Sequence, residues 1–239
     1  MYGHLARIGL IVPSNNTVVE PEFWRMMPEG VAAFAARILS GGLSPDAINA
    51  MVERSHRAAE ELRAGDMTMI AYACLATSLM KGRGWNVEFE NAVTATTGKP
   101  VVLAASATIE ALKYVGAKTI ALATPYPQHV NELLRGYFAT DGLEVVSLHN
   151  VVAKNSLEVC RLTPDVAYNL AKQTDVPEAD VVCILATDFR TIDTIDKLER
   201  ELNKPVISTN QALMWKSLQI CNVRADISQF GSMLRRGGS

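Results

Sequence analysis

Several features that would place the chain in a specialised class are missing from its 239 residues. No apolar run reaches the roughly 18–20 residues that a membrane-spanning helix needs. The 23 lysines and arginines are balanced by 25 acidic residues, so the basic excess that binds nucleic acids or membrane surfaces is absent. The N-terminus enters an apolar segment without a signal-peptide core. These absences predict a soluble, cytoplasmic, globular protein that binds neither nucleic acid nor membrane.

Cysteine is also scarce, and the four that occur lie far apart: Cys74, Cys160, Cys183 and Cys221. There is no C-x-x-C pair and no cluster of cysteine with histidine. A disulfide framework or a zinc site would need closer, paired spacings. The spacing therefore predicts reduced thiols and no metal site. No glycine-rich nucleotide-binding motif is present either.

What the chain does contain is an alternation of short apolar runs with helical patterns. Near-continuous apolar strands bounded by helices are typical of parallel strands buried on both faces. The predicted strands span residues 7–12, 31–39, 67–73, 100–104, 119–123, 143–149, 181–185 and 205–208. The predicted helices include 45–63, 105–115, 127–140, 163–173, 191–202 and 210–220, and the tail 235–239 is expected to be frayed. The predicted fold class is α/β, doubly wound.

The two halves of the chain resemble each other. The segment 7–13 is similar to 119–125, so that Pro13 matches Pro125, 112 residues later. The segment 98–102 is likewise similar to 203–207, 105 residues later. We therefore expect two lobes, one of residues 1–104 with a returning C-terminal segment 209–239, the other of residues 105–208. Because ligands bind beyond the carboxyl ends of parallel strands, the predicted site is the cleft between the lobes.

Cys74 is the strongest candidate for chemistry. It stands where an apolar strand ends and the small and hydroxyl residues of segment 75–78 begin. A cysteine buried in a strand is most often inert packing. At a strand end, the thiol would instead lie in the cleft beside free backbone N–H groups, which bind carboxylates and lower a thiol pKa. We predict that Cys74 is catalytic, whereas Cys183 is mid-strand and is expected to belong to the core.

Polar residues follow other strand ends. Ser14 and Asn16 come directly after the first strand, where they either cap a helix or bind a substrate carboxylate, and we expect Asn16 to contact the ligand. Tyr126 lies between two prolines at the equivalent turn of the second half, where it either points into the cleft or packs on the surface.

The turn that matches Cys74 in the second half carries no thiol. With the offset of 112 residues, Ala186 takes the place of Cys74 and is followed by Thr187 and Asp188. Asp188 and Arg190 are expected to cap a helix and form a structural ion pair, with substrate binding as the alternative. The four histidines are scattered, and no Ser/His/Asp arrangement is predicted.

Together these segments resemble a known family. The segments 9–20, 72–74, 124–126, 154–158 and 187–191 are similar to the maleate cis–trans isomerase and arylmalonate decarboxylase branch of the aspartate/glutamate racemase superfamily. The similarity runs from residue 7 to about residue 220, and the Pro-Ser-Asn-Asn-Thr segment 13–17 is typical of the isomerases. The resemblance implies two pseudo-symmetric α/β lobes, an active site between them, no cofactor and a homo-oligomer.

The resemblance also implies a reaction. In the isomerases, a first-lobe cysteine at the position of Cys74 attacks the double bond of maleate and forms a covalent adduct. Rotation about the resulting single bond, followed by elimination, gives fumarate. The family's ligand-binding residues would correspond to Asn16, Tyr126 and Asn155. We add the neighbouring turn residues to the expected substrate-binding set, namely Ser14, Leu75, Ala76, Thr187 and Asp188.

The departure from the family is Ala186, where the isomerases carry a second cysteine. Arylmalonate decarboxylases show the opposite arrangement, with the second cysteine and without the first. Covalent catalysis through Cys74 alone then requires Tyr126, Asp188 or water to handle the proton. Ala186 is a natural change that marks a different reaction, an engineered substitution that traps a substrate, or the sign of an impaired enzyme.

The leading hypothesis is therefore a cofactor-independent isomerase of a small unsaturated dicarboxylate. The alternative enzyme is a Cys74-dependent hydrolase or decarboxylase of a related amide, cyclic imide or malonate. The alternative of another class is an inactive protein that binds or senses a small acid. Product mass separates the two enzymes, since hydrolysis and decarboxylation change the mass of the substrate whereas isomerisation does not.

Overall fold

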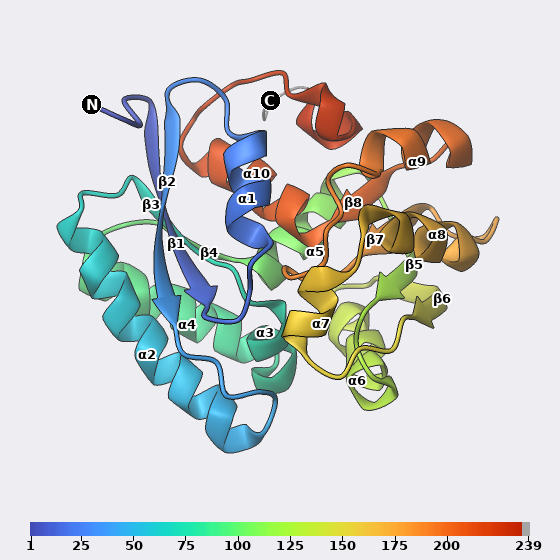
Figure 1. The fold of residues 1–239 in the computed structure, drawn as a ribbon, viewed down its shortest axis with the longest axis horizontal. Coiled ribbons are helices and arrows are strands. Elements are labelled where there is room, and N and C mark those ends of the chain that lie inside the picture. Colours follow the sequence, from blue (N-terminus) through green and yellow to red (C-terminus); the bar gives the residue numbers. More distant parts are fainter. Residues whose placement is uncertain (236–239) are drawn as a thin grey trace.

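A computed structural model describes residues 1–235 and shows two parallel four-stranded sheets flanked by helices (Figure 1). The first sheet has the order β2-β1-β3-β4, with β1 Ala6–Pro13, β2 Val31–Ile38, β3 Met69–Tyr72 and β4 Val101–Leu103. The second has the order β6-β5-β7-β8, with β5 Thr119–Thr124, β6 Glu144–Asn150, β7 Val181–Ile184 and β8 Val206–Ser208. Each strand coincides with a predicted apolar run, and the predicted α/β class with two pseudo-symmetric lobes is confirmed. Most of the tail predicted to be frayed lies outside the described residues.

The helices alternate with these strands. They are α1 Val19–Met26, α2 Pro45–Ala64, α3 Leu75–Lys81, α4 Arg83–Thr97, α5 Ala104–Tyr114, α6 Gln128–Ala139, α7 Ser156–Arg161, α8 Pro164–Thr174, α9 Ile195–Leu202 and α10 Thr209–Ile220. Two 3-10 turns, η1 Ser228–Phe230 and η2 Ser232–Leu234, follow α10. The predicted stretches correspond to α2, α5, α6, α8, α9 and α10. The predicted stretches do not include the other four, and three of these are only six to eight residues long.

The register of the sheets confirms the internal repeat. Ile8 pairs with Met69 in the first sheet, and Ile120 pairs with Val181 in the second, 112 residues later in both strands. The pairing continues one residue past each strand, where the N–H groups of Ala73 and Leu185 donate to the strands β1 and β5, each at 2.9 Å. Cys74 and Ala186 are therefore structurally equivalent positions.

One hydrophobic core extends through both lobes, and a second, smaller one lies between the first sheet and the helices α2 and α4. Helices α2 and α4 cover the outer face of the first sheet, while α8 and α9 lie against the second. Between the sheets, α5 packs against α10; α10 also contacts α1, β3 and β4, and α5 contacts β8 (Figure 1). The buried apolar residues of this middle layer form one cluster that extends through both sheets. The lobe boundaries drawn from the sequence stay a prediction.

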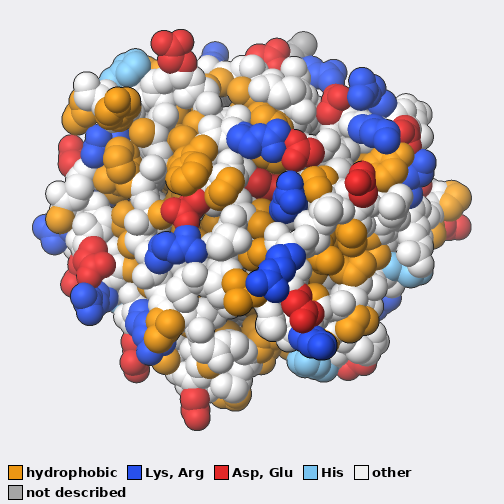
Figure 2. Space-filling model, viewed as in Figure 1, with side chains coloured by type: hydrophobic (Ala, Val, Ile, Leu, Met, Phe, Trp, Pro, Cys, Tyr) orange, Lys and Arg blue, Asp and Glu red, His pale blue; other side chains and the backbone are white. Residues whose placement is uncertain are grey.

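The surface carries mixed charge. Lysine and arginine side chains are scattered among acidic ones over the face shown in Figure 2. Within residues 1–235, none of the helices combines the length and the apolar character that a membrane crossing requires.

Candidate active site

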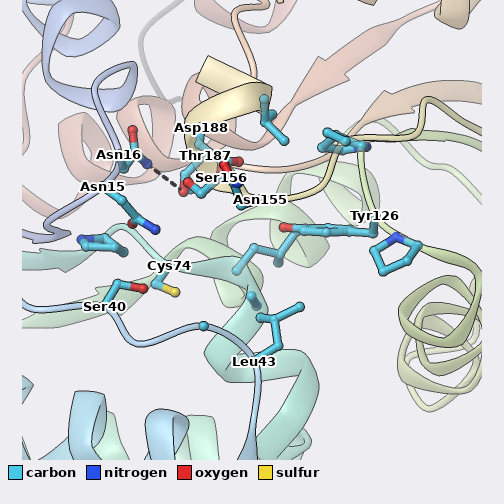
Figure 3. Close-up of a pocket in the computed structure, with 18 of the residues that line it drawn as sticks. Asn15, Asn16, Ser40, Leu43, Cys74, Tyr126, Asn155, Ser156, Thr187 and Asp188 are labelled. Atoms are coloured by element: carbon cyan, nitrogen blue, oxygen red, sulfur yellow. Dashed lines mark hydrogen bonds between the residues drawn. The ribbon is translucent and has the colours of Figure 1, made fainter. Parts of the chain in front are cut away.

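A cavity of about 410 Å³ lies at the carboxyl ends of the strands of both sheets. Its walls come from the segments that follow β1, β2 and β3 in the first lobe and β5, β6 and β7 in the second. In the first sheet, the direction of winding reverses between β1 and β3, and such switch points open a crevice for ligands. Predicted site residues that line the cavity are Leu75 and Ala76, together with Asn16, Cys74, Tyr126, Asn155, Thr187 and Asp188 (Figure 3).

Cys74 occupies the turn between β3 and α3. It has an extended backbone and is only 6% exposed, and its Sγ lies 3.2 Å from Oγ1 of Thr77. The hydroxyl of Tyr72 donates to the same Thr77 Oγ1 at 3.1 Å and so holds it in place. Burial raises the pKa of the Cys74 thiol, and the hydroxyl and backbone N–H of Thr77 oppose this only in part. The prediction that the strand-end position lowers the pKa of Cys74 is therefore wrong, because the loss of solvent around the thiol outweighs the nearby hydrogen-bond donors. At neutral pH the thiol keeps its proton and needs a base.

Asn16 and Thr187 join the two lobes directly beside Cys74. The Asn16 side chain accepts from the N–H groups of Val18 and Val19 at 2.9 and 3.1 Å, which secures the start of α1. Its amide donates to Thr187 Oγ1 at 3.1 Å, and that hydroxyl donates to the carbonyl of Ala73 at 3.1 Å (Figure 3). Asn16 thus both binds the N–H groups at the start of α1, where Val18 is the N-cap residue, and lines the cavity, with one amide hydrogen left for a ligand.

Ser14 does not line the cavity. Its hydroxyl accepts from the N–H of Ser40 at 3.1 Å, which ties the segment after β2 to the end of β1. At this corner Asn15 and Ser40 line the cavity together with Asn16 (Figure 3). Asn15 belongs to the polar segment that was predicted to bind the ligand through Asn16, so the sequence could have identified it as a site residue. Nothing in the sequence indicates that Ser40 reaches the cavity.

Ala186 is buried behind the cavity surface and is not among the lining residues. Its φ of 96° lies in a region that L-residues rarely adopt, and its N–H donates to Oγ1 of Thr209 at 3.2 Å. The helix predicted from residue 191 begins only at Ile195. The N–H groups of Thr191 and Ile192 donate to the buried carboxylate of Glu22 at 2.7 and 3.2 Å, and this holds the segment in a loop. Asp188 therefore caps no helix, contrary to one of the two expectations for it.

Asp188 and Tyr126 instead face the cavity from the second lobe. The hydroxyl of Ser156, at the start of α7, donates to Oδ2 of Asp188 in a short hydrogen bond of 2.5 Å. Burial raises the pKa of the Asp188 carboxyl, and the Ser156 hydrogen bond lowers it by less. Burial also raises the pKa of Tyr126, and the charges of Asp188 and Cys74 act in the same direction. Tyr126 therefore presents a protonated phenol, which is a hydrogen-bond donor at neutral pH.

An apolar wall completes the cavity. Leu43, Ile48 and Met51 contribute it from α2 and the segment before it. These residues look like the buried face of an amphipathic helix, and the sequence contains no sign that this face reaches a ligand. The basic side chains at the cavity are Lys154 and His129, both exposed. Among residues 1–235, no group of three or more His, Cys, Asp and Glu side chains is placed to hold a metal ion.

Comparison with known proteins assigns the family. The family model described as arylmalonate decarboxylase matches residues 8–234. The chain belongs to this family. A maleate isomerase from Geobacillus stearothermophilus is 30% identical over 242 residues, which cover 95% of this chain and 96% of the relative. The branch inferred from the sequence, in which maleate isomerases and arylmalonate decarboxylases stand together, is thereby confirmed.

Two solved structures of the family have the same fold. A maleate isomerase from Pseudomonas putida S16, solved as a cysteine-to-alanine variant with maleate, superposes with a TM-score of 0.91 at 24% identity over 98% of both chains. A maleate cis-trans isomerase from Nocardia farcinica superposes with a TM-score of 0.89 at 27% identity, over 96% of this chain and 98% of that one. The latter is a cysteine-to-serine mutant that holds a covalently bound succinylcysteine intermediate.

Proposed function

We propose that the chain is a cofactor-independent enzyme that isomerises a small cis-unsaturated dicarboxylate of the maleate type through a covalent adduct on Cys74. The observation that carries this proposal is the position of Cys74. Its thiol opens into a cavity at the switch point between β1 and β3, and the chain belongs to a family in which a relative was trapped as a succinylcysteine.

The chemistry follows from the adduct. The sulfur of Cys74 adds to one carbon of the double bond and the neighbouring carbon gains a proton, which leaves a single bond about which the substrate rotates. Loss of a proton from the neighbouring carbon and release of the sulfur then regenerate the double bond in the trans form. Nothing is gained or lost overall, so substrate and product have the same mass.

Neutral donors would hold the two carboxylates. The amide of Asn16 and the phenol of Tyr126 line the cavity on opposite sides, with Asn155 and Thr187 between them (Figure 3). Leu75 and Ala76 begin α3, where backbone N–H groups have no partner within the helix. Such donors bind an anion without an ion pair, which leaves the substrate free to rotate after the adduct forms.

A single thiol is sufficient for the covalent step. The Nocardia relative holds a succinylcysteine although one of its cysteines has been replaced by serine. By the same logic, Ala186 does not prevent an adduct on Cys74. What the missing second thiol removes is a group for proton transfer.

The test is to incubate the protein with maleate and follow the appearance of fumarate by NMR, with intact-protein mass spectrometry in parallel. We expect fumarate in solution and a succinyl adduct on Cys74. A product that has lost CO₂ would indicate a decarboxylase, and one that has gained water a hydrolase. A protein that leaves maleate and its close analogues unchanged would refute the substrate assignment.

A further inference from the structure

The proposed reaction leaves one role unfilled. The Cys74 thiol must lose its proton before it attacks, and the carbon beside the attacked one must gain a proton and later lose one. Ala186, at the position equivalent to Cys74 in the second lobe, offers only a methyl group. The group that moves these protons must therefore be another residue at the cavity.

The cavity has four candidates besides Cys74: Tyr126, His129, Lys154 and Asp188. Burial raises the pKa of Tyr126 well above its usual value, so the phenol donates but does not take up a proton. His129 and Lys154 are exposed, on α6 and in the segment after β6. Asp188 is partly buried and lies beside Ser156 and Thr187, across the cavity from Cys74 (Figure 3).

We propose that Asp188 is the catalytic acid–base residue of this site, which takes the proton from Cys74, delivers it to the substrate carbon and later removes a proton from that carbon. The inference rests on the proposed function, because it concerns the same reaction. It assigns to one carboxyl group on the second lobe the work that a second thiol would otherwise do.

The contacts of Asp188 suit this role. Ser156 donates to Oδ2 and so orients the carboxyl group, while among residues 1–235 no lysine, arginine or histidine forms an ion pair with it. The groups that face it are Ser156 from α7, Tyr126 from the segment after β5 and Cys74 at the start of α3. Burial raises the pKa of the carboxyl, which makes its carboxylate a stronger base than that of an exposed aspartate and moves the pKa toward neutral pH, where one group can act first as base and then as acid.

The proton and electron count closes within the site. The S–H bond of Cys74 breaks and its proton moves to the carboxylate of Asp188. The sulfur bonds to one substrate carbon, the π electrons move to the neighbouring carbon, and that carbon takes the proton from Asp188. After rotation, Asp188 removes a proton, the C–H electrons form the trans double bond, and the C–S bond breaks. The sulfur leaves as a thiolate and recovers its proton from Asp188.

Asp188→Asn tests the inference, because asparagine keeps the size and one acceptor oxygen but carries no transferable proton. We expect turnover of maleate to fall at least about a hundredfold, the lower end of a general acid–base contribution. Asp188→Glu should retain more activity than Asp188→Asn. Asp165→Asn, an exposed aspartate in the first turn of α8, is the matched control and should leave turnover unchanged.

A second measurement separates catalysis from folding and needs no substrate. The rate of alkylation of Cys74 by iodoacetamide, followed by peptide mass spectrometry against pH, reports its thiolate. The negative charge of Asp188 raises the pKa of Cys74, so Asp188→Asn should move the alkylation midpoint to lower pH. The variant would then hold more thiolate and nevertheless turn over more slowly. A merely structural role of Asp188 predicts no such opposite movement.

The outcomes distinguish this inference from the function on which it rests. If wild-type protein converts none of the cis-unsaturated acids, the proposed function fails and the inference falls with it. If wild-type protein is active and Asp188→Asn keeps more than half of that activity, the inference alone is refuted. An unchanged alkylation midpoint would also refute it, because it would show that Asp188 does not act on the Cys74 thiol.

Discussion

In the first lobe, the chain leaves β3 through Cys74 and enters α3 at once; in the second, it leaves β7 through Ala186 and stays irregular until α9 begins at Ile195. The two positions are equivalent in the sheets, and the strands before them pair in the same register. The backbones nevertheless differ, since Cys74 has a φ of −141° and Ala186 a φ of 96°. The repeat is thus conserved in the strands and lost in the turn that follows them.

This difference divides the site between the lobes. The first-lobe turn presents a nucleophile at the start of a helix. In the second-lobe turn, the N–H groups of Thr191 and Ile192 donate to Glu22 of the other lobe. Thr187 and Asp188 of the same turn line the cavity. One lobe therefore contributes covalent chemistry, and the other contributes orientation and proton transfer.

The largest effect on activity is expected when the turn after β3 is given the alanine that the turn after β7 carries. Cys74→Ala removes the nucleophile, so the isomerisation of maleate should fall by at least about a thousandfold, and the succinyl adduct should disappear from the mass spectrum. Cys221→Ala is the matched control, because this partly buried cysteine lies at the end of α10 and does not line the cavity. Residual turnover above a tenth of wild type would show that Cys74 is not the nucleophile.

How far the sequence predicts this site follows from the same two turns. The apolar runs mark every strand, and the signal is most continuous in β1, β3, β5 and β7, which are buried on both faces. The offset of the internal repeat is enough by itself to match Ala186 with Cys74. Asparagines, prolines and a tyrosine directly after strand ends identify the polar part of the cavity, since the carboxyl ends of parallel strands meet at one edge.

The rest depends on packing that has no local signal. Leu43, Ile48 and Met51 are apolar residues of the kind that fill any core, and only the tertiary arrangement exposes part of them to the cavity. The pKa of Cys74 depends on how deeply the turn is buried, which the strand-end position alone does not reveal. The late start of α9 depends on Glu22, a residue about 170 positions earlier in the chain.

The next effect concerns stability and the contact that distinguishes the second turn. Glu22 is 5% exposed and accepts from Thr191, Ile192 and Asn210, and burial raises its pKa from 4.5 to about 7. The folded protein therefore binds the proton more tightly than the unfolded chain. The contribution of Glu22 to stability is fully present below pH 4.5 and is lost as the pH rises to about 7, by about 3 kcal/mol in all.

Glu22→Gln isolates the pH-dependent contribution of Glu22 to stability, because glutamine does not titrate. The free energy of unfolding, measured by urea denaturation between pH 4.5 and 8, should fall with pH more steeply for wild type than for the variant. The altered hydrogen bond to Asn210 adds an offset that does not depend on pH. The contribution of the carboxyl group is therefore measured by how the difference in the free energy of unfolding between the two proteins changes with pH. A difference that stays constant with pH would contradict the raised pKa.

A smaller effect is expected from the hydroxyl that joins the two turns. Thr187→Val keeps the shape but leaves the amide of Asn16 and the carbonyl of Ala73 without their partner, at a cost of about 2 kcal/mol in the free energy of unfolding. Because Asn16 lines the cavity, KM for maleate should also rise. Thr108→Val is the matched control, since that buried hydroxyl donates only to a carbonyl of its own helix, at 2.7 Å. Equal losses in the two variants would mean that the interlobe hydrogen bonds contribute nothing specific.

The last prediction restores the symmetry instead of removing it. In the Asp188→Asn background, Ala186→Cys places a thiol at the position equivalent to Cys74. If that thiol reaches the substrate, turnover should rise about tenfold above that of Asp188→Asn, which is equivalent to about 1.4 kcal/mol in the barrier. Asp188→Asn with Ala186→Ser is the control, because serine has a similar size but no readily ionised group. Kinetics with maleate at several pH values provide the measurement. If neither double variant recovers activity, then the positive φ at position 186 directs the side chain away from the cavity. The backbone, and not the missing sulfur, would then be what separates the two turns.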